Sequence, residues 1–218
     1  MPTQPYKNSK GERLPSVTQC LSVLAKPAVI HWAWQLGIEG LDYRKVKDDA
    51  SNTGTLVHDL ILNDLSGTKP DLSRWTIDQI RSTDASWIKW NEWREKHKVE
   101  PILLEAALIS NEYQYGGTFD FFGRIDDEVV LADFKTSKAL YVENFCQLAA
   151  YEQLVWECGK MVNTAKKPLS LRVIRVGKEN GGELKEYVLP REDVEKYWNM
   201  FLATKTIYEI NKSAKLPK

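Results

Sequence analysis

Two aspartates and a lysine in the middle of the chain have the types and spacing for metal-assisted hydrolysis. Asp120 precedes a polar pair at 126–127, and Asp133 and Lys135 follow it. The runs on either side are rich in aromatic and β-branched residues, which predicts two strands joined by a tight turn. Counting outward from that turn places Asp120 opposite Asp133. Because side chains alternate along a strand, Lys135 shares a face with Asp133.

This opposition would be unfavourable for two bare carboxylates. Directly opposed residues of an antiparallel pair have Cβ atoms about 4.5–5.5 Å apart, where like charges repel. A divalent cation removes the objection, because hard cations bind carboxylate oxygens. The pattern therefore predicts that Asp120 and Asp133 bind a metal beside the ammonium of Lys135. The alternative is an exposed hairpin face whose charges are simply solvated, since an Asp-x-Lys spacing is common by chance.

Short motifs surround these residues in a fixed order along the chain. In that order they are Leu14-Pro15-Ser16-Val17-Thr18-Gln19-Cys20-Leu21, Gly54-Thr55-Leu56-Val57-His58, Gly116-Gly117-Thr118-Phe119-Asp120, Asp133-Phe134-Lys135-Thr136-Ser137 and Gln147-Leu148-Ala149-Ala150-Tyr151. The ordered set resembles the PD-(D/E)XK nuclease superfamily and, within it, the RecB-like branch with its phage and prophage members. The resemblance runs from about residue 14 to about residue 155.

The resemblance implies a metal site and assigns its ligands. Asp120, Asp133 and the backbone carbonyl of Phe134 would hold Mg²⁺, and Mn²⁺ would substitute for it. His58 would add a nitrogen ligand, although taken alone this residue would be a core histidine. Lys135 would orient the attacking water or stabilise charge on the phosphate. A neighbouring cation would lower the pKa of this lysine and make a base role feasible.

Further residues have accessory roles in the resemblance. Glu105, in a strand expected over 103–110, would contact the lysine or a metal-bound water; its alternative is an exposed strand carboxylate. Gln147 and Tyr151 stand four apart on an expected helix and therefore share a face. That face would touch the metal-site strand and the DNA backbone. Thr136 and Ser137 are expected to bind DNA as well.

The implied function is that of a magnesium-dependent deoxyribonuclease. No separate base-reading module is evident, which favours an exonuclease of phage or bacterial DNA recombination, repair or replication. A structure-specific or non-specific endonuclease is the alternative. A non-catalytic nucleic-acid-binding subunit and a hydrolase of small phosphoesters stay open as other classes. The expected partners are DNA and a single-strand annealing or other recombination protein, and a homo-oligomer stays open.

Composition bounds the class of protein. The 218 residues are 43% hydrophobic and 28% charged, ordinary values for a globular protein, and the formal net charge is zero. DNA contacts therefore have to come from local patches. No apolar run reaches the roughly 20 residues of a membrane span, and no signal peptide is evident, so we expect a cytoplasmic protein without membrane contact.

The cysteines argue against a metal cluster. Cys20, Cys146 and Cys158 show no C-x-x-C spacing. Relatives that carry an iron–sulfur cluster use one early cysteine and three near the C-terminus, and no cysteine follows Cys158. We therefore expect no iron–sulfur cluster.

The order of elements predicts one α/β (α+β) domain over 14–218 behind a flexible arm over 1–13. Helices come first, a small mixed central sheet follows, and a last helix opens after Pro190. The resemblance describes this as a restriction-endonuclease-like core with a helical N-terminal part. We also expect a polar connection over 48–53 and a hairpin turn over 178–182.

One helix is expected to be rich in tryptophan. Trp87, Trp90 and Trp93 stand three apart among apolar neighbours, which predicts that they fill the interface between the helical and sheet layers. Stacking of these rings on nucleotide bases is the alternative.

Overall fold

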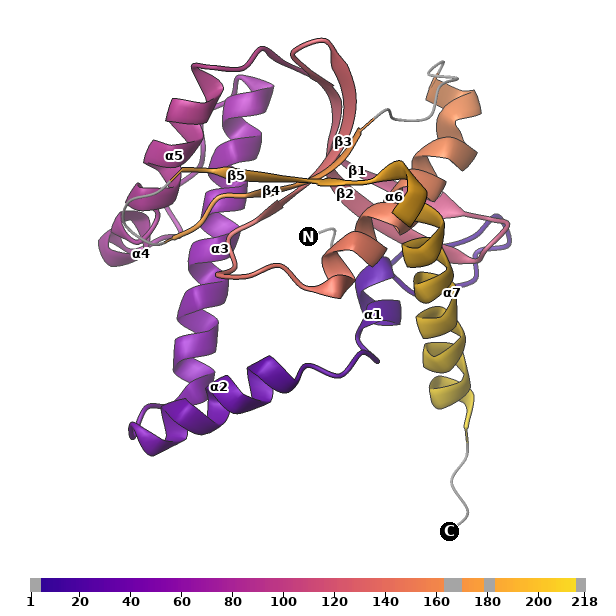
Figure 1. The fold of residues 1–218 in the computed structure, drawn as a ribbon, viewed down its shortest axis with the longest axis horizontal. Helices are drawn as coiled ribbons and strands as arrows, with labels where there is room; N and C mark the ends of the chain where they lie inside the picture. The colour runs from indigo at the N-terminus through magenta and orange to yellow at the C-terminus, as the bar shows by residue number, and fades with distance from the viewer. Residues whose placement is uncertain (1–4, 163–169, 179–182, 215–218) are drawn as a thin grey trace.

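A mixed sheet forms the centre of the protein (Figure 1). The structure, a computed structural model, describes residues 5–162, 170–178 and 183–214. Within these residues the strands lie in the order β1-β2-β3-β4-β5, with β3 and β4 parallel and the other neighbours antiparallel. The strands are β1 (Val99–Ser110), β2 (Tyr115–Ile125), β3 (Glu128–Lys135), β4 (Ser170–Arg175) and β5 (Lys185–Leu189). This confirms the expected mixed sheet flanked by helices.

Helices cover both faces of the sheet. They are α1 (Val17–Leu21), α2 (Pro27–Ile38), α3 (Tyr43–Ser66), α4 (Ile77–Arg81), α5 (Asp84–Arg94), α6 (Val142–Val162) and α7 (Arg191–Ser213). Apolar side chains of α3 and α5 pack on one face, and those of α1, α6 and α7 pack on the other (Figure 1). Helix α6 is the crossover that the parallel pair β3–β4 requires. None of the helices in the described part of the chain has the length and apolar character to span a membrane.

The hairpin of β2 and β3 has the predicted register. Its ladder runs from Phe121–Ala132 to Ile125–Glu128 around the turn at 126–127, where Asp126 has a φ of 54°. The ladder ends one residue before Asp120 and Asp133, so their direct opposition is not part of it. Beyond this point β2 stays paired with β1, while β3 continues beside β4 as far as Lys135. The strands therefore separate where the candidate residues begin.

The N-terminal helices differ in part from expectation. The polar connection expected over 48–53 was wrong, because α3 is already helical there. It begins earlier, where the Asp42 side chain accepts a hydrogen bond from the backbone N–H of Arg44 at 2.8 Å and caps the helix. Helix α1 begins after Ser16, which forms a capping box with Gln19. Of the expected hairpin turn over 178–182, residues 179–182 lie outside the described residues.

Residues 5–13 lie against the sheet, although the segment 1–13 was expected to be a flexible arm. An isolated bridge joins Lys7 and Arg13. Within this small loop the Asn8 amide nitrogen donates to Glu12 Oε2 at 2.7 Å and to Gln114 Oε1 at 2.9 Å. The contact of Asn8 with Gln114 spans more than a hundred residues of sequence, so no local pattern predicts it.

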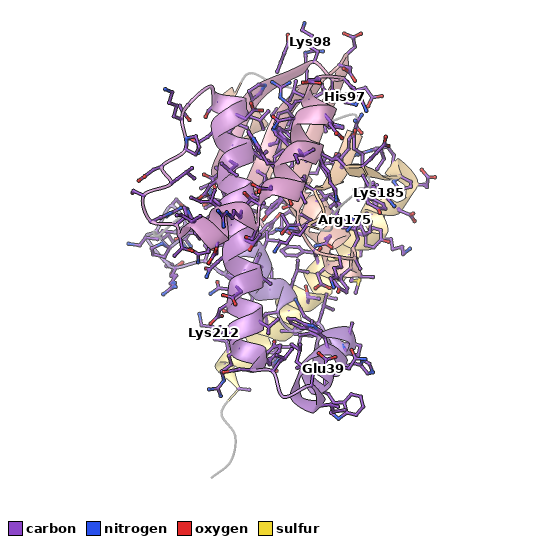
Figure 2. The ribbon with its side chains drawn as sticks, turned by 90° about the vertical axis from the view of Figure 1, so that its left-hand side faces the viewer. Glu39, His97, Lys98, Arg175, Lys185 and Lys212 are labelled. Atoms are coloured by element: carbon purple, nitrogen blue, oxygen red, sulfur yellow. The ribbon has the colours of Figure 1, made fainter. Side chains whose placement is uncertain are left out.

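The tryptophan helix α5 serves the core. Trp90 and Trp93 are buried, and the indole nitrogen of Trp90 donates to Asp64 at 2.9 Å while that of Trp93 donates to Glu186 at 2.8 Å. Their burial confirms the core prediction for these two rings and leaves no face of them for stacking on bases. Trp87 is half-buried and packs against the same cluster. Just after α5, His97 contacts Asp126 of the β2–β3 turn. His97 and Lys98 lie at one end of the molecule, and Glu39, which follows α2, lies at the other end (Figure 2).

Candidate active site

A cleft of about 620 Å³ lies at the end of the sheet where the two helical layers meet. Its walls come from the N-terminal segment, α1, α3, β1, β2, β3 and α6. Nine of the ten residues singled out from the sequence line it, namely His58, Glu105, Asp120, Asp133, Phe134, Lys135, Thr136, Gln147 and Tyr151. The tenth, Ser137, turns its hydroxyl to the carbonyl of Ala139 at 2.8 Å.

Asp120 is held from both sides of the cleft. Its Oδ1 lies 2.9 Å from Nε2 of His58 on α3, and its Oδ2 accepts a hydrogen bond from the backbone N–H of Phe134 at 2.7 Å. Burial would raise the pKa of this carboxyl, but His58, Lys135 and the Phe134 N–H outweigh burial and lower the pKa. Asp120 is therefore a carboxylate at neutral pH.

Asp133 lies deeper, with 1% of its surface exposed. It stands between Ala132 and Phe134, which face α3 and α5, so its own side chain points to the α6 layer. Its Oδ2 lies 2.5 Å from Nζ of Lys135. Burial raises the pKa of Asp133 to about 6, with the charge of Asp120 adding to the effect and Lys135 opposing it. Two carboxylates thus share one buried region, and one of them titrates near neutral pH.

Lys135 is a cation in this arrangement. Burial would lower its pKa, but Asp133 and Asp120 outweigh burial and raise it. The lowered pKa considered from the sequence depended on a neighbouring cation. In the protein as described, the neighbours of Lys135 are carboxylates, and they favour its charged form.

His58 contacts carboxylates through both ring nitrogens. In addition to Asp120 at Nε2, Glu105 Oε1 lies 3.9 Å from Nδ1. Burial would lower the pKa of His58, but Asp120, Glu105 and Asp133 outweigh burial and raise it. Glu105 has a φ of 45°, a left-handed conformation that non-glycine residues seldom adopt and that concentrates at functional sites. The two carboxylate contacts of His58 differ from what is expected of an ordinary core histidine.

Two motif glycines let the walls of the cleft come close. A Cβ at Gly54 of α3 would stand 3.0 Å from the Thr136 hydroxyl, and one at Gly117 of β2 would stand 2.7 Å from the Tyr151 ring. Gly54 and His58 lie four residues apart on α3 and share a face. The close approach of α3 to Thr136 at Gly54 therefore places His58 near the end of β3.

Gln147 and Tyr151 form part of the wall itself. Both are buried, and the Gln147 amide nitrogen donates to the Tyr151 hydroxyl at 2.7 Å. Tyr151 also packs edge-on against Phe119. The expected contacts of Gln147 and Tyr151 with a metal-site strand and with DNA stay predictions.

Sequence reasoning missed two residues of this region. Tyr6, from the segment expected to be flexible, lines the cleft. Arg175 of β4 (labelled in Figure 2) donates from Nη1 to the carbonyls of Ser137 and Lys138, at 3.1 and 3.0 Å, and so fixes the loop that follows Lys135. Arg175 pairs with Lys135 in the parallel ladder, a long-range relation without a local signal.

The donor atoms fit a hard divalent cation, although they do not form a finished cage. Within the described residues, no three His, Cys, Asp or Glu side chains are grouped as a metal site. Asp120 is engaged by His58 and Phe134, and Asp133 by Lys135. Two carboxylates at one cleft nevertheless supply the oxygen ligands that Mg²⁺ uses. Each has a partner that a cation would replace.

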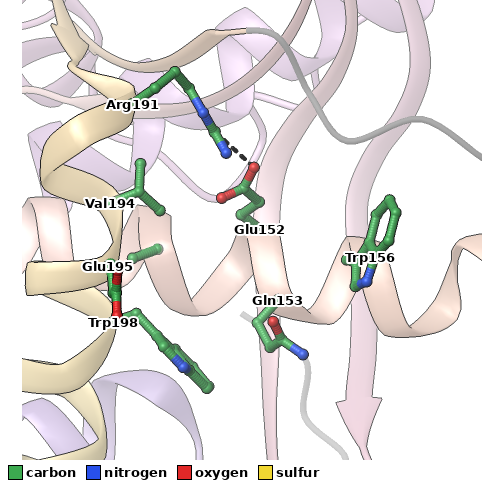
Figure 3. Close-up of a pocket in the computed structure, with 8 residues that line it drawn as sticks. Glu152, Gln153, Trp156, Arg191, Val194, Glu195 and Trp198 are labelled. Atoms are coloured by element: carbon green, nitrogen blue, oxygen red, sulfur yellow. Dashed lines mark hydrogen bonds and ion pairs between the residues drawn. The ribbon is translucent and has the colours of Figure 1, made fainter.

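A second, smaller pocket of about 320 Å³ lies between α6 and α7 (Figure 3). Its buried carboxylate, Glu152, accepts a hydrogen bond from Arg191 Nη1 at 2.7 Å, and Figure 3 shows these two side chains pointing toward each other. Trp156 and Trp198 contribute the aromatic walls. The pocket presents one buried acid matched by one arginine, which is a structural pairing.

Comparison with solved structures supports the fold. A crystal structure named "Putative exonuclease" from Eubacterium rectale matches with a TM-score of 0.51 and 12% sequence identity, over 75% of this chain and 69% of that chain. The crystal structure of SSO0001 matches with a TM-score of 0.34 and 11% identity, over 86% of this chain and 74% of that chain, and carries no argument at that score. The first likeness shows a shared fold alone. The chain matched no family model and no curated protein sequence.

Proposed function

We propose that this protein is a metal-dependent nuclease that hydrolyses DNA phosphodiester bonds in the cleft at the end of the sheet. The observation that carries the proposal is the pair of carboxylates in the cleft, the half-buried Asp120 and the buried Asp133, with Lys135 beside them. Their cleft is open to a ligand, and the fold is shared with a structure that bears the name of an exonuclease. The likeness supports the fold, and the residues support the chemistry.

The roles follow from the contacts of each residue. Asp120, Asp133 and the backbone carbonyl of Phe134 would hold Mg²⁺, with Mn²⁺ as a substitute that the nitrogen of His58 would favour. When bound, the metal supplies a Lewis acid and lowers the pKa of its bound water. His58 has to give up its contact with Asp120 before the metal can bind. Because the pKa of His58 is raised, this histidine keeps its proton to a higher pH, and it would lose that proton as the pH rises further.

Lys135 then acts on the phosphate. Its ammonium lies in the cleft 2.5 Å from Asp133 and is held in the charged form by both aspartates. A fixed positive charge stabilises the negative charge that builds on phosphate oxygens during displacement. The raised pKa favours this role over that of a general base.

We further propose that cleavage starts at strand ends. The cleft is lined by residues of both helical layers and by the segment that carries Tyr6. A free end enters such a site more readily than continuous duplex does. The name of the structural neighbour agrees with this exonuclease assignment.

Digestion of end-labelled linear DNA beside covalently closed circular DNA tests both proposals. With Mg²⁺ we expect the linear substrate to be degraded and the circle to survive, and with chelator we expect both to survive. Comparable rates on the circle would replace the exonuclease by an endonuclease. Undiminished hydrolysis in chelator would reject the metal-dependent mechanism.

A further inference from the structure

Tyr6 is built into the cleft by contacts far along the sequence. Its ring covers Gly116, where a Cβ would stand 2.3 Å from the Tyr6 ring carbon Cγ. Its carbonyl accepts a hydrogen bond from the Leu14 N–H at 2.9 Å, and Gly116 N–H donates to Pro15 at 2.9 Å. The segment before α1 is thereby fixed along the end of β2. Tyr6 is a defined part of the wall.

The hydroxyl of Tyr6 forms a pair with that of Thr118. The two oxygens are 2.8 Å apart, and both side chains line the cleft that contains Asp120. Each hydroxyl carries one proton. One of the two protons lies between the oxygens, so the other is left to donate away from the pair. Thr118 stands two residues before Asp120, which places this donor next to the proposed metal ligands.

The charges of the cleft give this donor a purpose. The acidic lining residues are Asp59, Glu105, Asp120 and Asp133, and the basic ones are His58 and Lys135. Both basic groups already contact carboxylates. A polyanionic strand therefore meets a wall with more acids than bases, and neutral donors can hold its phosphates without removing these cations from their partners. Hydroxyl groups are ordinary ligands of phosphate oxygens in nucleic-acid complexes.

We propose that Tyr6 is a substrate-contact residue whose hydroxyl, paired with Thr118, binds a non-bridging phosphate oxygen of the nucleic-acid strand in the cleft. This inference rests on the proposed nuclease function and adds a neutral backbone contact to it. Such a contact releases no counterion, so it contributes affinity without contributing to the dependence of binding on salt. That property separates it from a lysine or arginine contact.

The test is Tyr6→Phe, which keeps the ring over Gly116 and removes only the hydroxyl. The matched control is Tyr208→Phe on α7, outside the cleft. A neutral hydrogen bond corresponds to a factor of about 2 to 12 in affinity. We expect KM for a short fluorescent single-stranded oligonucleotide, and its Kd in chelator, to rise by such a factor in Tyr6→Phe. The kcat, the melting temperature and the slope of log Kd against log salt should stay at parent values, and the control should match the parent throughout.

Thr118→Val completes the cycle. If the two hydroxyls act as one donor unit, the double variant should bind about as weakly as the weaker single variant, because interacting sites are not additive. A lowered melting temperature with unchanged KM in Tyr6→Phe would make the pair structural and overturn the inference. Unchanged values in every measurement would overturn it too.

The outcomes also separate this inference from the proposed function. If the parent digests DNA, Asp133→Ala does not, and Tyr6→Phe equals the parent, the Tyr6 contact alone is wrong. If the parent neither binds nor digests DNA, both proposals are wrong.

Discussion

Helix α6 stands between two regions, the cleft and the pocket against α7. Each region buries one carboxylate, and the two carboxylates have different partners. Tyr151 faces the cleft beside Asp133, while the adjacent Glu152 faces the pocket against α7. Asp133 and Glu152 are 1% and 3% exposed, so burial does not distinguish them. Their partners do. Glu152 contacts the guanidinium of Arg191 at 2.7 Å, whereas Asp133 contacts Lys135 and lies near Asp120.

Arg191 gives Glu152 a partner of constant charge. The guanidinium keeps its charge throughout the physiological range, so Glu152 and Arg191 remain a fixed pair. In the cleft, burial raises the pKa of Asp133 to about 6, with the charge of Asp120 adding to the effect, and the pKa of His58 is raised because Asp120, Glu105 and Asp133 outweigh burial. Groups that can change charge or partner at working pH are suited to binding a metal and a substrate. The difference predicts chemistry in the cleft and stability in the pocket.

The largest effect should follow removal of charge from the cleft. Asp120→Ala and Lys135→Ala should each lower the rate of DNA hydrolysis about 100-fold or more, because each removes a group aimed at the phosphate or its metal. Far-ultraviolet circular dichroism and thermal melting should show a retained fold. Parent rates in either variant would mean that the carboxylate cleft is not where hydrolysis occurs.

The wall shared with α6 offers the next test. Gly117→Ala places a methyl group 2.7 Å from the Tyr151 ring and should lower the free energy of unfolding by about 1–3 kcal/mol and reduce hydrolysis as well. Gly37→Ala is the matched control, because its Cβ meets nothing within 4 Å and helical alanine is more stable than helical glycine by about 0.5–1 kcal/mol. Equal melting temperatures for the two variants would contradict the close packing of this wall.

How far the sequence predicts such contacts depends on their range. The turn at 126–127 and the alternation around it predicted the register of Phe121–Ile125 correctly, because a short hairpin is set by local residues. The same counting also placed Asp120 opposite Asp133, but the β2–β3 ladder ends one residue before this pair. Beside Asp133, β3 is paired with β4, and no local pattern predicts that pairing.

The missed residues of the cleft have the same explanation. Tyr6 depends on the glycine at 116, and Arg175 depends on the loop after Lys135, both across long stretches of chain. The motif residues could be proposed because their spacing is short and ordered. Their mutual distances, and the contact of His58 with Asp120 in particular, required the fold.

The pH dependence of metal binding should distinguish the cleft from the pocket. Asp133 has to be ionised to bind a cation, and its pKa of about 6 means that it takes up a proton as the pH falls through that value. Proton and metal then compete, so the Mg²⁺ concentration for half-maximal activity should rise as the pH falls below about 6. Calorimetric titration of Mg²⁺ at two pH values measures this. A Mg²⁺ affinity that stays constant across pH 6 would contradict the involvement of Asp133.

The smallest of these effects should come from His58. His58→Ala should weaken Mn²⁺ and Mg²⁺ binding by less than Asp120→Ala does, because it removes one supporting ligand while both carboxylates remain. His31→Ala on α2 is the control for loss of a histidine outside the cleft. Identical metal titrations for the parent and His58→Ala would return His58 to a packing role.

Two isosteric amides separate the chemistry of the cleft from that of the pocket. Asp133→Asn and Glu152→Gln each replace one buried carboxylate by its amide, and digestion of end-labelled linear DNA in Mg²⁺ is measured at equal concentrations of folded protein. We expect Asp133→Asn to lose hydrolysis, and we expect Glu152→Gln to melt at a lower temperature and to digest DNA at the parent rate. Digestion by Asp133→Asn at the parent rate, or loss of hydrolysis in folded Glu152→Gln, would contradict this separation.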